Sequence, residues 1–210
     1  RNTELDLSNI PLQFEHMKII AKAIVHFKHL TSILIPNVDM TSDGMVVICN
    51  AIKQIPHCTS LNLTSNYNLC KMSSAKLSTL GIQAIAQCKQ LQCLHLQYCN
   101  IDETECIEQL AASLKQLNHL RELTLFGNNL STNFAAICDS LTSIPNLNCI
   151  DLGYCSLNAN DCAVLAKKIK LLNRLKRLIL WGNKIGDKSG ALLICEMQVA
   201  NIQIVLFELV

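Results

Sequence analysis

The sequence predicts an α/β fold in which short parallel strands and helices alternate in a curved stack, with the strands on the concave face and the helices on the convex face. Three observations support this prediction. One apolar pattern recurs about eight times in 210 residues, with start-to-start spacings of 26 to 33 residues. Within each repeat the apolar residues first alternate with a period of two and then follow helical spacing. A unit of this length cannot bury its apolar side alone, so neighbouring repeats must stack.

The strands are predicted at the start of each repeat, where the pattern reads L-x-x-L-x-L-x-x-N/C-x-L. The repeat that starts at Leu91 continues with Leu94, Leu96, Cys99 and Ile101. The alternation around Leu94 turns one face of a short strand toward a core. The ninth residue, Asn or Cys, ends the strand and is expected to bond to backbone groups in the turn. The repeats start at Asn2, Leu30, Cys58, Leu91, Leu120, Leu147, Leu175 and Asn201.

The helices are predicted in the second half of each repeat. Ile107, Leu110, Ala111 and Leu114 fall at i, i+3, i+4 and i+7, which is the apolar stripe of an amphipathic helix. The stretch 163–169 approximates the same spacing.

Polar residues that favour helix starts precede these stripes. Asp102, with Glu105 three residues later, resembles a capping box. Other candidate caps are Thr41, Ser42, Ser131 and Asn160. Pro56 and Pro145 lie two residues before repeat starts, where helix must give way to strand.

The composition limits the possible partners and the possible compartment. Half of the chain is hydrophobic and the formal net charge is only +2, so nothing demands nucleic acid or an acidic membrane as a partner. No apolar run is long enough to span a membrane. Residues 1–210 are predicted to form one domain, and because the chain opens inside a repeat we expect a fragment of a longer protein. The longest spacing carries an insertion at 66–77, which is expected to form a loop on one rim.

The twelve cysteines are predicted to be small buried residues in a reducing compartment. Most recur at equivalent places in the repeats, which gives parallel rows instead of chosen disulfide pairs. The sequence has no Cys-x-x-Cys and no zinc-finger spacing, so we expect neither a metal nor any other cofactor.

The strand-ending residues Cys99, Asn128, Cys155 and Asn183 alternate between Cys and Asn. With repeats near 28 residues, this alternation resembles the leucine-rich repeat proteins of the ribonuclease-inhibitor type. That resemblance implies a horseshoe-shaped solenoid with a full helix on the convex side of each repeat. Members include ribonuclease inhibitor, the repeat ends of NOD-like immune receptors and the GTPase-activating protein of Ran. The short chain and irregular early repeats look most like a NOD-like receptor tail.

Aromatic residues gather at two positions of the repeat although the chain has only nine of them. Tyr98 and Tyr154 are eighth in their repeats, and Phe126, Trp181 and Phe207 are seventh. These positions are expected to face outward on the concave side, where adjacent strands lie about 4.8 Å apart and the rings would form a continuous line. We predict a protein-binding surface there. The alternative is that the rings only pack on one another and support the curvature.

Charged residues are predicted to share that surface and to orient the partner. They flank the aromatic positions in the same repeats. The candidates are His95, Arg121, Glu122, Asp151, Lys176 and Arg177.

The predicted function is a protein-binding module, a cytoplasmic ligand-recognition or autoinhibitory domain of an innate immune receptor. The alternatives are an inhibitor like ribonuclease inhibitor, a microbial effector that binds a host protein, a GTPase-activating protein of this fold, or a structural extension of a larger solenoid. No nucleophile with a matched base, glycine-rich phosphate loop or carboxylate pair stands at a defensible spacing, so we do not expect an enzyme. We expect a protein partner, no nucleic acid and no membrane.

Overall fold

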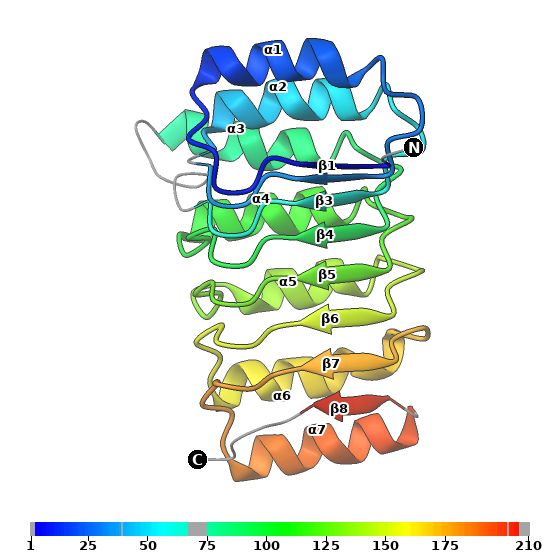
Figure 1. Cartoon of the computed structure of the whole chain (residues 1–210). Helices are drawn as coiled ribbons and strands as arrows, with labels where there is room; N and C mark the ends of the chain where they lie inside the picture. Colours follow the sequence, from blue (N-terminus) through cyan, green and yellow to red (C-terminus); the bar gives the residue numbers. More distant parts are fainter. Residues whose placement is uncertain (1–2, 39, 67–74, 201, 206–210) are drawn as a thin grey trace.

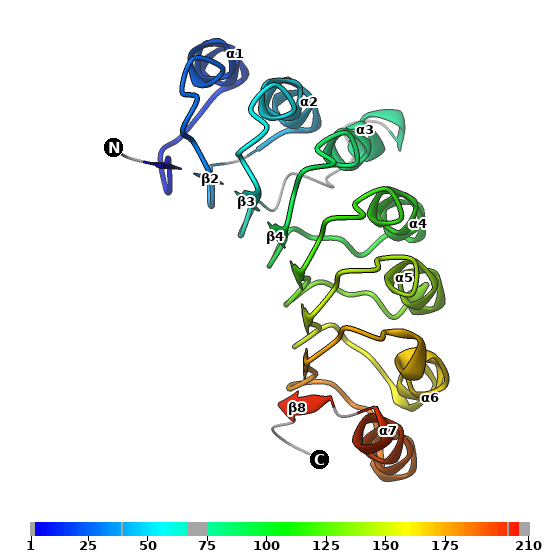
Figure 2. The ribbon, with the colours of Figure 1, turned by 90° about the vertical axis from the view of Figure 1, so that its right-hand side faces the viewer.

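The computed structural model describes residues 3–38, 40–66, 75–200 and 202–205. In this part of the chain, eight strands and seven α-helices alternate in one curved stack (Figure 1). Figure 2 shows the strands on the inner side of the arc and the helices on its outer side. The predicted fold class, a leucine-rich repeat solenoid of about eight repeats, is confirmed.

The strands and helices alternate along the whole described chain. The strands are β1 (Glu4–Asp6), β2 (Ser32–Leu34), β3 (Ser60–Asn62), β4 (Cys93–His95), β5 (Glu122–Thr124), β6 (Cys149–Asp151), β7 (Arg177–Ile179) and β8 (Gln203–Val205). The α-helices are α1 (Phe14–Ile24), α2 (Ser42–Ile52), α3 (Ala75–Ile85), α4 (Thr104–Leu114), α5 (Phe134–Leu141), α6 (Ala159–Lys168) and α7 (Asp187–Val199). A short 3-10 helix, Ile169–Leu171, extends α6.

The strands form one parallel sheet in sequence order, without a shift of register. Each strand pairs only with its sequence neighbours, through residues at equivalent places in the repeat. The residues that pair at the strand centres are Leu5, Ile33, Leu61, Leu94, Leu123, Ile150, Leu178 and Ile204.

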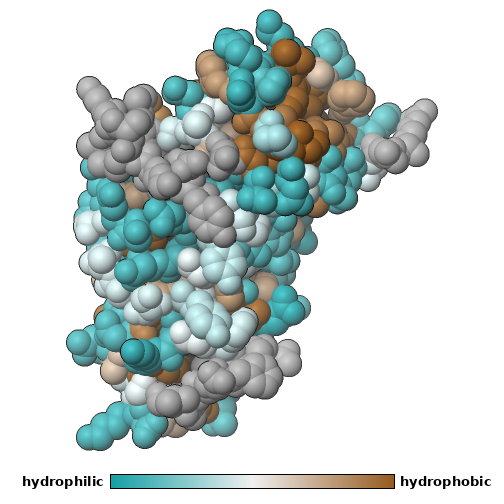
Figure 3. Space-filling model, turned by 60° about the vertical axis from the view of Figure 1, so that its left-hand side comes forward, coloured by the Kyte–Doolittle hydropathy of each residue, from teal (hydrophilic) through white to brown (hydrophobic). Residues whose placement is uncertain are grey.

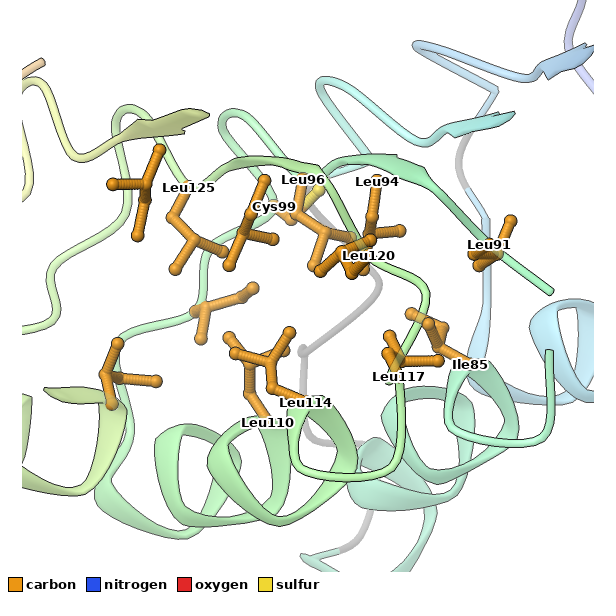
Figure 4. Packing of buried hydrophobic residues seen from close by; sticks show 14 of the residues in the cluster. Ile85, Leu91, Leu94, Leu96, Cys99, Leu110, Leu114, Leu117, Leu120 and Leu125 are labelled. Atoms are coloured by element: carbon orange, nitrogen blue, oxygen red, sulfur yellow. The ribbon is translucent and has the colours of Figure 1, made fainter. Parts of the chain in front are cut away.

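The core lies between the sheet and the helices. Leu94 and Leu96, from β4 and the turn after it, point toward Leu110 and Leu114 of α4 (Figure 4). Each of these side chains is at most 1% exposed. The predicted strand and helix stripes therefore face one another, and burial of each leucine is worth about 1.5 to 3 kcal/mol.

In the third, fifth and seventh repeats, a buried asparagine joins the repeat to the one before it. Oδ1 of Asn128 accepts from the backbone N–H of Cys99 at 3.0 Å and of Ile101 at 3.1 Å. Its Nδ2 donates to the carbonyls of Leu96 at 2.8 Å and of Leu125 at 2.7 Å. One side chain thus satisfies four backbone groups that the sheet no longer reaches. The residues that make the equivalent four bonds in other repeats are Asn66 and Asn183.

Cysteine occupies the same position in the alternate repeats and makes a weaker link. Sγ of Cys99 donates to the carbonyl of Leu63 at 3.2 Å, and Sγ of Cys155 donates to that of Leu125 at 3.3 Å. Of the eleven cysteines in the described residues, nine are buried, Cys93 is half-buried and only Cys195 is exposed. The predicted burial of the cysteines is confirmed.

The helix caps differ from the prediction in three of the repeats. Thr41 caps α2 as predicted, since its side chain accepts from the N–H of Gly44. The N-cap of α4 is Glu103, so the capping box predicted at Asp102 is wrong. Ser131 bonds to the side chain of Asn129 and does not cap α5.

In α6 the cap is Asn158 instead of the predicted Asn160. Oδ1 of Asn158 accepts from the N–H groups of Asn160 and Asp161, and the Asp161 carboxylate accepts from the Asn158 N–H. This reciprocal pair begins the helix two residues earlier than the sequence suggested. Ser42 is the first residue of α2 and not its cap.

The predicted rim insertion at 66–77 lies mostly outside the described residues. Its first residue, Asn66, is fully buried and belongs to the asparagine links. Among the described residues, no helix combines the length and the apolar composition needed to cross a lipid bilayer.

Asn128→Ala should lower the free energy of unfolding by about 3 kcal/mol, because four buried backbone groups lose their partner at once. Urea unfolding followed by circular dichroism measures this change. Asn129→Ala is the control, since Asn129 is the exposed neighbour of Asn128 and should change stability by less than about 0.5 kcal/mol. Equal losses in the two variants would contradict the assigned role of Asn128.

The buried thiols should make the fold less stable in alkali. Burial raises the pKa of Cys99 and of Cys155 from 9.0 to about 12. Below pH 9 both the folded and the unfolded chain keep these protons. Between pH 9 and 12 only the unfolded chain loses them, so each thiol favours unfolding by about 1.4 kcal/mol per pH unit.

The double variant Cys99→Ala/Cys155→Ala should therefore lose about 3 kcal/mol less stability than the wild type between pH 8 and pH 10. Urea unfolding at the two pH values measures the difference. Cys195→Ala, which removes an exposed thiol, should follow the wild type. The same drop in the double variant and the wild type would show that these thiols do not carry the pH dependence.

Candidate functional site

The aromatic side chains lie in the turns that directly follow four neighbouring strands. Tyr98 follows β4, Phe126 follows β5, Tyr154 follows β6 and Trp181 follows β7. The sheet ladder continues into these turns, since Tyr98 N–H donates to the Phe126 carbonyl and Tyr154 N–H to the Trp181 carbonyl, both at 2.9 Å. The in-register stacking thus fixes the backbones that carry the rings.

The four rings form one continuous cluster, which we name the aromatic ridge. The ring centroids of Tyr98 and Phe126 are 5.2 Å apart, and those of Phe126 and Tyr154 are 5.4 Å apart. Trp181 closes the cluster at 5.3 Å from Phe126 and 4.6 Å from Tyr154. Three of the four pairs meet edge to face, an arrangement worth about 0.5 to 1.5 kcal/mol for each pair.

The ridge remains open to solvent. Tyr98 is 42% exposed, Tyr154 49% and Trp181 36%, whereas Phe126 is half-buried because three rings touch it. Figure 3 shows the edge of the stack where the strands end. Hydrophobic brown gathers toward the top of this view, near α1, and the middle is paler. The geometric prediction of neighbouring, accessible rings is confirmed for these four residues. The fifth, Phe207, lies outside the described residues.

Glycines beneath the rings create the space that the ridge needs. A Cβ on Gly127 would lie 2.4 Å from the Tyr98 ring, and one on Gly182 would lie 2.8 Å from the Tyr154 ring. Both glycines have φ of +71°, a left-handed conformation that side chains rarely adopt. Tyr98 and Tyr154 hold the equivalent position of the alternate repeats with φ near +52° and +51°.

The alternation between repeats therefore extends from the core to the surface. In the repeats whose ninth residue is Asn128 or Asn183, the eighth residue is Gly and the seventh carries the ring; in the repeats of Cys99 and Cys155, the eighth residue carries the ring. Gly153 completes the fit, since a Cβ there would lie 2.8 Å from the Phe126 ring and 3.0 Å from Trp181 Nε1. Sequence reasoning missed these glycines, although Gly127 and Gly182 stand opposite Tyr98 and Tyr154 in the pattern.

Asp151 is the acidic residue that the structure joins to the ridge. Its Oδ1 accepts from the N–H of Gly153 at 2.9 Å, directly beneath the rings. Burial raises the pKa of the Asp151 carboxyl, while the Gly153 hydrogen bond and the charge of Arg177 oppose that rise.

The other predicted charges lie along the strands or at their opposite ends. Arg121 and Lys176 precede β5 and β7 and line a hollow that contains none of the rings. Phe126 follows Arg121 by five residues, along β5 and into the turn after it, a path that spans up to about 16 Å. The prediction placed Arg121 and Lys176 beside the rings, but the direction of the strands carries them to the opposite rim.

The remaining candidates lie on the strands of the concave face. Nδ1 of His95 is 3.2 Å from Oγ1 of Thr124, and Nε of Arg177 donates to Sγ of Cys149 at 3.2 Å. Glu122 lies on β5 and is half-buried. Among the described residues, no group of three or more His, Cys, Asp or Glu side chains has an arrangement that could hold a metal ion.

Gly153→Ala should displace the rings of Phe126 and Trp181 and cost about 1 to 3 kcal/mol of stability, because the added methyl overlaps both rings. Trp181 is the only tryptophan, so its fluorescence reports the displacement directly. We expect a shifted emission maximum for Gly153→Ala. Gly44→Ala, which adds the same methyl to α2 beside the Met40 side chain, should leave the spectrum unchanged. An unchanged spectrum for Gly153→Ala would contradict the glycine-to-ring fit.

Comparison with known proteins places this architecture among repeat proteins. No model of a known protein family matches the chain. The pig (Sus scrofa) ribonuclease inhibitor is 26% identical over 196 residues, covering 92% of this chain and 42% of that protein. The mouse (Mus musculus) ribonuclease inhibitor is 30% identical over 161 residues, covering 75% and 34%. Human (Homo sapiens) NACHT, LRR and PYD domains-containing protein 12 is 26% identical over 194 residues, covering 88% and 17%.

The chain spans less than half the length of each of these relatives. Among solved structures, a crystal structure of a TLR13–ssRNA13 complex aligns with 97% of this chain and 32% of that chain, at 19% identity and a TM-score of 0.46. The repeat pattern, the in-register parallel sheet and these relatives show that the chain is a leucine-rich repeat protein of the ribonuclease-inhibitor type, resembling the repeat domains of NLR proteins.

Proposed function

We propose that this chain is a protein-interaction module whose aromatic ridge binds a protein partner. The observation that carries the proposal is a cluster of four contacting rings, three of them more than one-third exposed, on one edge of the concave face. Exposed aromatic clusters of this kind are unusual on a surface that has no partner, and Tyr and Trp are enriched among the residues that dominate binding energy.

The ridge also has the rigidity that favours tight binding. Each ring touches at least one neighbouring ring, and the rings of Tyr98, Phe126 and Tyr154 already fill the space above the glycines. Little side-chain freedom is left to lose when a partner docks, so more of the buried area contributes to affinity. The alternative interpretation is that the rings only pack on one another. That packing also fixes the rings in place and so favours the binding of a partner.

The relatives favour a place in innate immune recognition. We propose that residues 1–210 form one repeat domain of a longer cytoplasmic receptor of the NLR type, where it recognises a ligand or keeps the receptor inactive. The many buried thiols suit a reducing compartment. The feature that this chain shares with its relatives is the repeat scaffold. We therefore propose a binding role without a catalytic reaction.

An inhibitor of a ribonuclease is the second candidate, favoured by the two relatives named ribonuclease inhibitor. The assay adds the chain to a pancreatic-type ribonuclease and follows RNA cleavage. Inhibition at stoichiometric concentrations would select this candidate over a receptor domain.

Tyr154→Ala and Trp181→Ala should each weaken partner binding at least about tenfold, because central aromatic anchors contribute about 2 kcal/mol or more to binding. Proteins captured by the wild-type chain are identified and purified, and their affinity is then measured by calorimetry. Phe27→Ala is the matched control: Phe27 is 60% exposed but lies outside the ridge, so affinity should not change.

Hydrogen exchange provides an independent readout of the same proposal. The bound partner should protect the backbone of the turns at 97–98, 126–127, 153–154 and 181–182. A partner that binds both ring variants as tightly as the wild type would exclude the ridge as its binding site. Circular dichroism of each variant confirms that the fold is intact.

A further inference from the structure

A polar hollow of about 760 Å³ opens at the end of the strands opposite to the aromatic ridge. It lies where the helices of the later repeats give way to β5, β6 and β7. Its floor is partly apolar, formed by residues such as Leu175 and Ile202. We name this concavity the rim hollow. The polar side chains that line it are Arg121, Asn146, Asn148, Asn173, Arg174 and Lys176.

The sheet places two of its cations in one row. Arg121, Asn148 and Lys176 are second in their repeats and hold neighbouring places in the ladder. The N–H of Asn148 donates to the Arg121 carbonyl at 2.9 Å, and the N–H of Lys176 donates to the Asn148 carbonyl at 2.8 Å. Two strand spacings therefore separate the backbones of Arg121 and Lys176, about 10 Å, with an amide between them.

The third cation is held in place by hydrogen bonds between repeats. Nη1 of Arg174 donates to Oδ1 of Asn146 at 2.8 Å, and Nδ2 of Asn146 donates to the carbonyl of Asn118 at 2.8 Å. This chain of bonds fixes one nitrogen of the guanidinium at the wall and leaves its other nitrogens to bind a ligand.

The lining is cationic without a counter-charge. None of the side chains that line the rim hollow is acidic. Within the part of the chain that the structure describes, the ion pairs are Lys18 with Glu15 and Lys168 with Asp139, so none of the three cations of the hollow is in one. Three positive charges in one concavity raise the local concentration of anions.

We propose that the rim hollow binds an acidic peptide segment of the protein partner, a proposal that rests on the proposed function. The spacing of the cations favours a peptide over a compact phosphate. Alternate residues of an extended chain project to one side about 7 Å apart, so two carboxylates can reach Arg121 and Lys176 together. Asn148, between the two cations, can pair with the peptide backbone, and the apolar floor accommodates the methylene groups of Glu side chains.

The rim hollow and the aromatic ridge together specify the orientation of the partner. They lie at opposite ends of the same strands, up to about 16 Å apart along the strand direction. A partner that presents an apolar patch to the rings and acidic residues to the rim hollow can dock in only one direction. The charged end also accelerates the encounter, in a way that salt suppresses.

The test measures binding of a rhodamine-labelled hexaglutamate peptide to the whole chain by fluorescence anisotropy, with no partner present. The double variant Arg121→Gln/Lys176→Gln and the single variant Arg174→Gln should each weaken binding about tenfold or more. Lys188→Gln, which removes an exposed cation of α7 outside the hollow, should bind as the wild type. A hexaglutamine peptide should not bind, and raising the salt from 50 to 500 mM should abolish hexaglutamate binding.

The outcomes separate this proposal from the proposed function. Trp181→Ala should bind hexaglutamate like the wild type, so failure of the ridge leaves the peptide result intact. Absence of hexaglutamate binding, or equal binding by the double variant and Lys188→Gln, overturns the rim hollow. Pyrophosphate that binds more tightly than the peptide and displaces it also overturns the proposal, since the hollow is then a phosphate site.

Discussion

The structure depends on the hydrogen bonds that buried side chains make between repeats. The sheet ladder continues into the turns but leaves other backbone groups there buried without a ladder partner, and an unsatisfied buried group costs about 1 to 3 kcal/mol. Asn66, Asn128 and Asn183 each satisfy four such groups in two repeats. These links hold the turns of neighbouring repeats in register. The rings and glycines that the turns carry are therefore also in register.

The aromatic ridge follows directly from this constraint. The turn requires a left-handed residue at its eighth position, which Gly127 and Gly182 supply without cost and which Tyr98 and Tyr154 adopt in the alternate repeats. A ring on one repeat therefore lies over a glycine of the next. The two-repeat alternation that organises the core thus also determines which surface positions can carry large rings and how closely they pack.

The concave face has two chemically different ends because its strands are short and parallel. Residues before the strands reach one rim and residues after them reach the other. In the later repeats the first set contains Arg121 and Lys176, and the second contains the rings of the aromatic ridge. All strands of a parallel sheet run in the same direction, so the cations collect at one rim and the rings at the other. In an antiparallel sheet both kinds of residue would occur at both rims. A partner that contacts both rims can therefore dock in only one direction.

The sequence by itself determined the repeat register, the alternation of strand and helix, the buried cysteines and the sharing of one surface by Tyr98, Phe126, Tyr154 and Trp181. A period near 28 residues brings equivalent positions together, so these conclusions need only local pattern and stacking. The tertiary structure alone decided the bonds of each asparagine, the glycine-to-ring fit, the caps at Glu103 and Asn158, and the rim reached by Arg121 and Lys176. Those features depend on distances between atoms of different repeats, and a one-dimensional pattern specifies which repeats are neighbours but not how far apart their side chains lie.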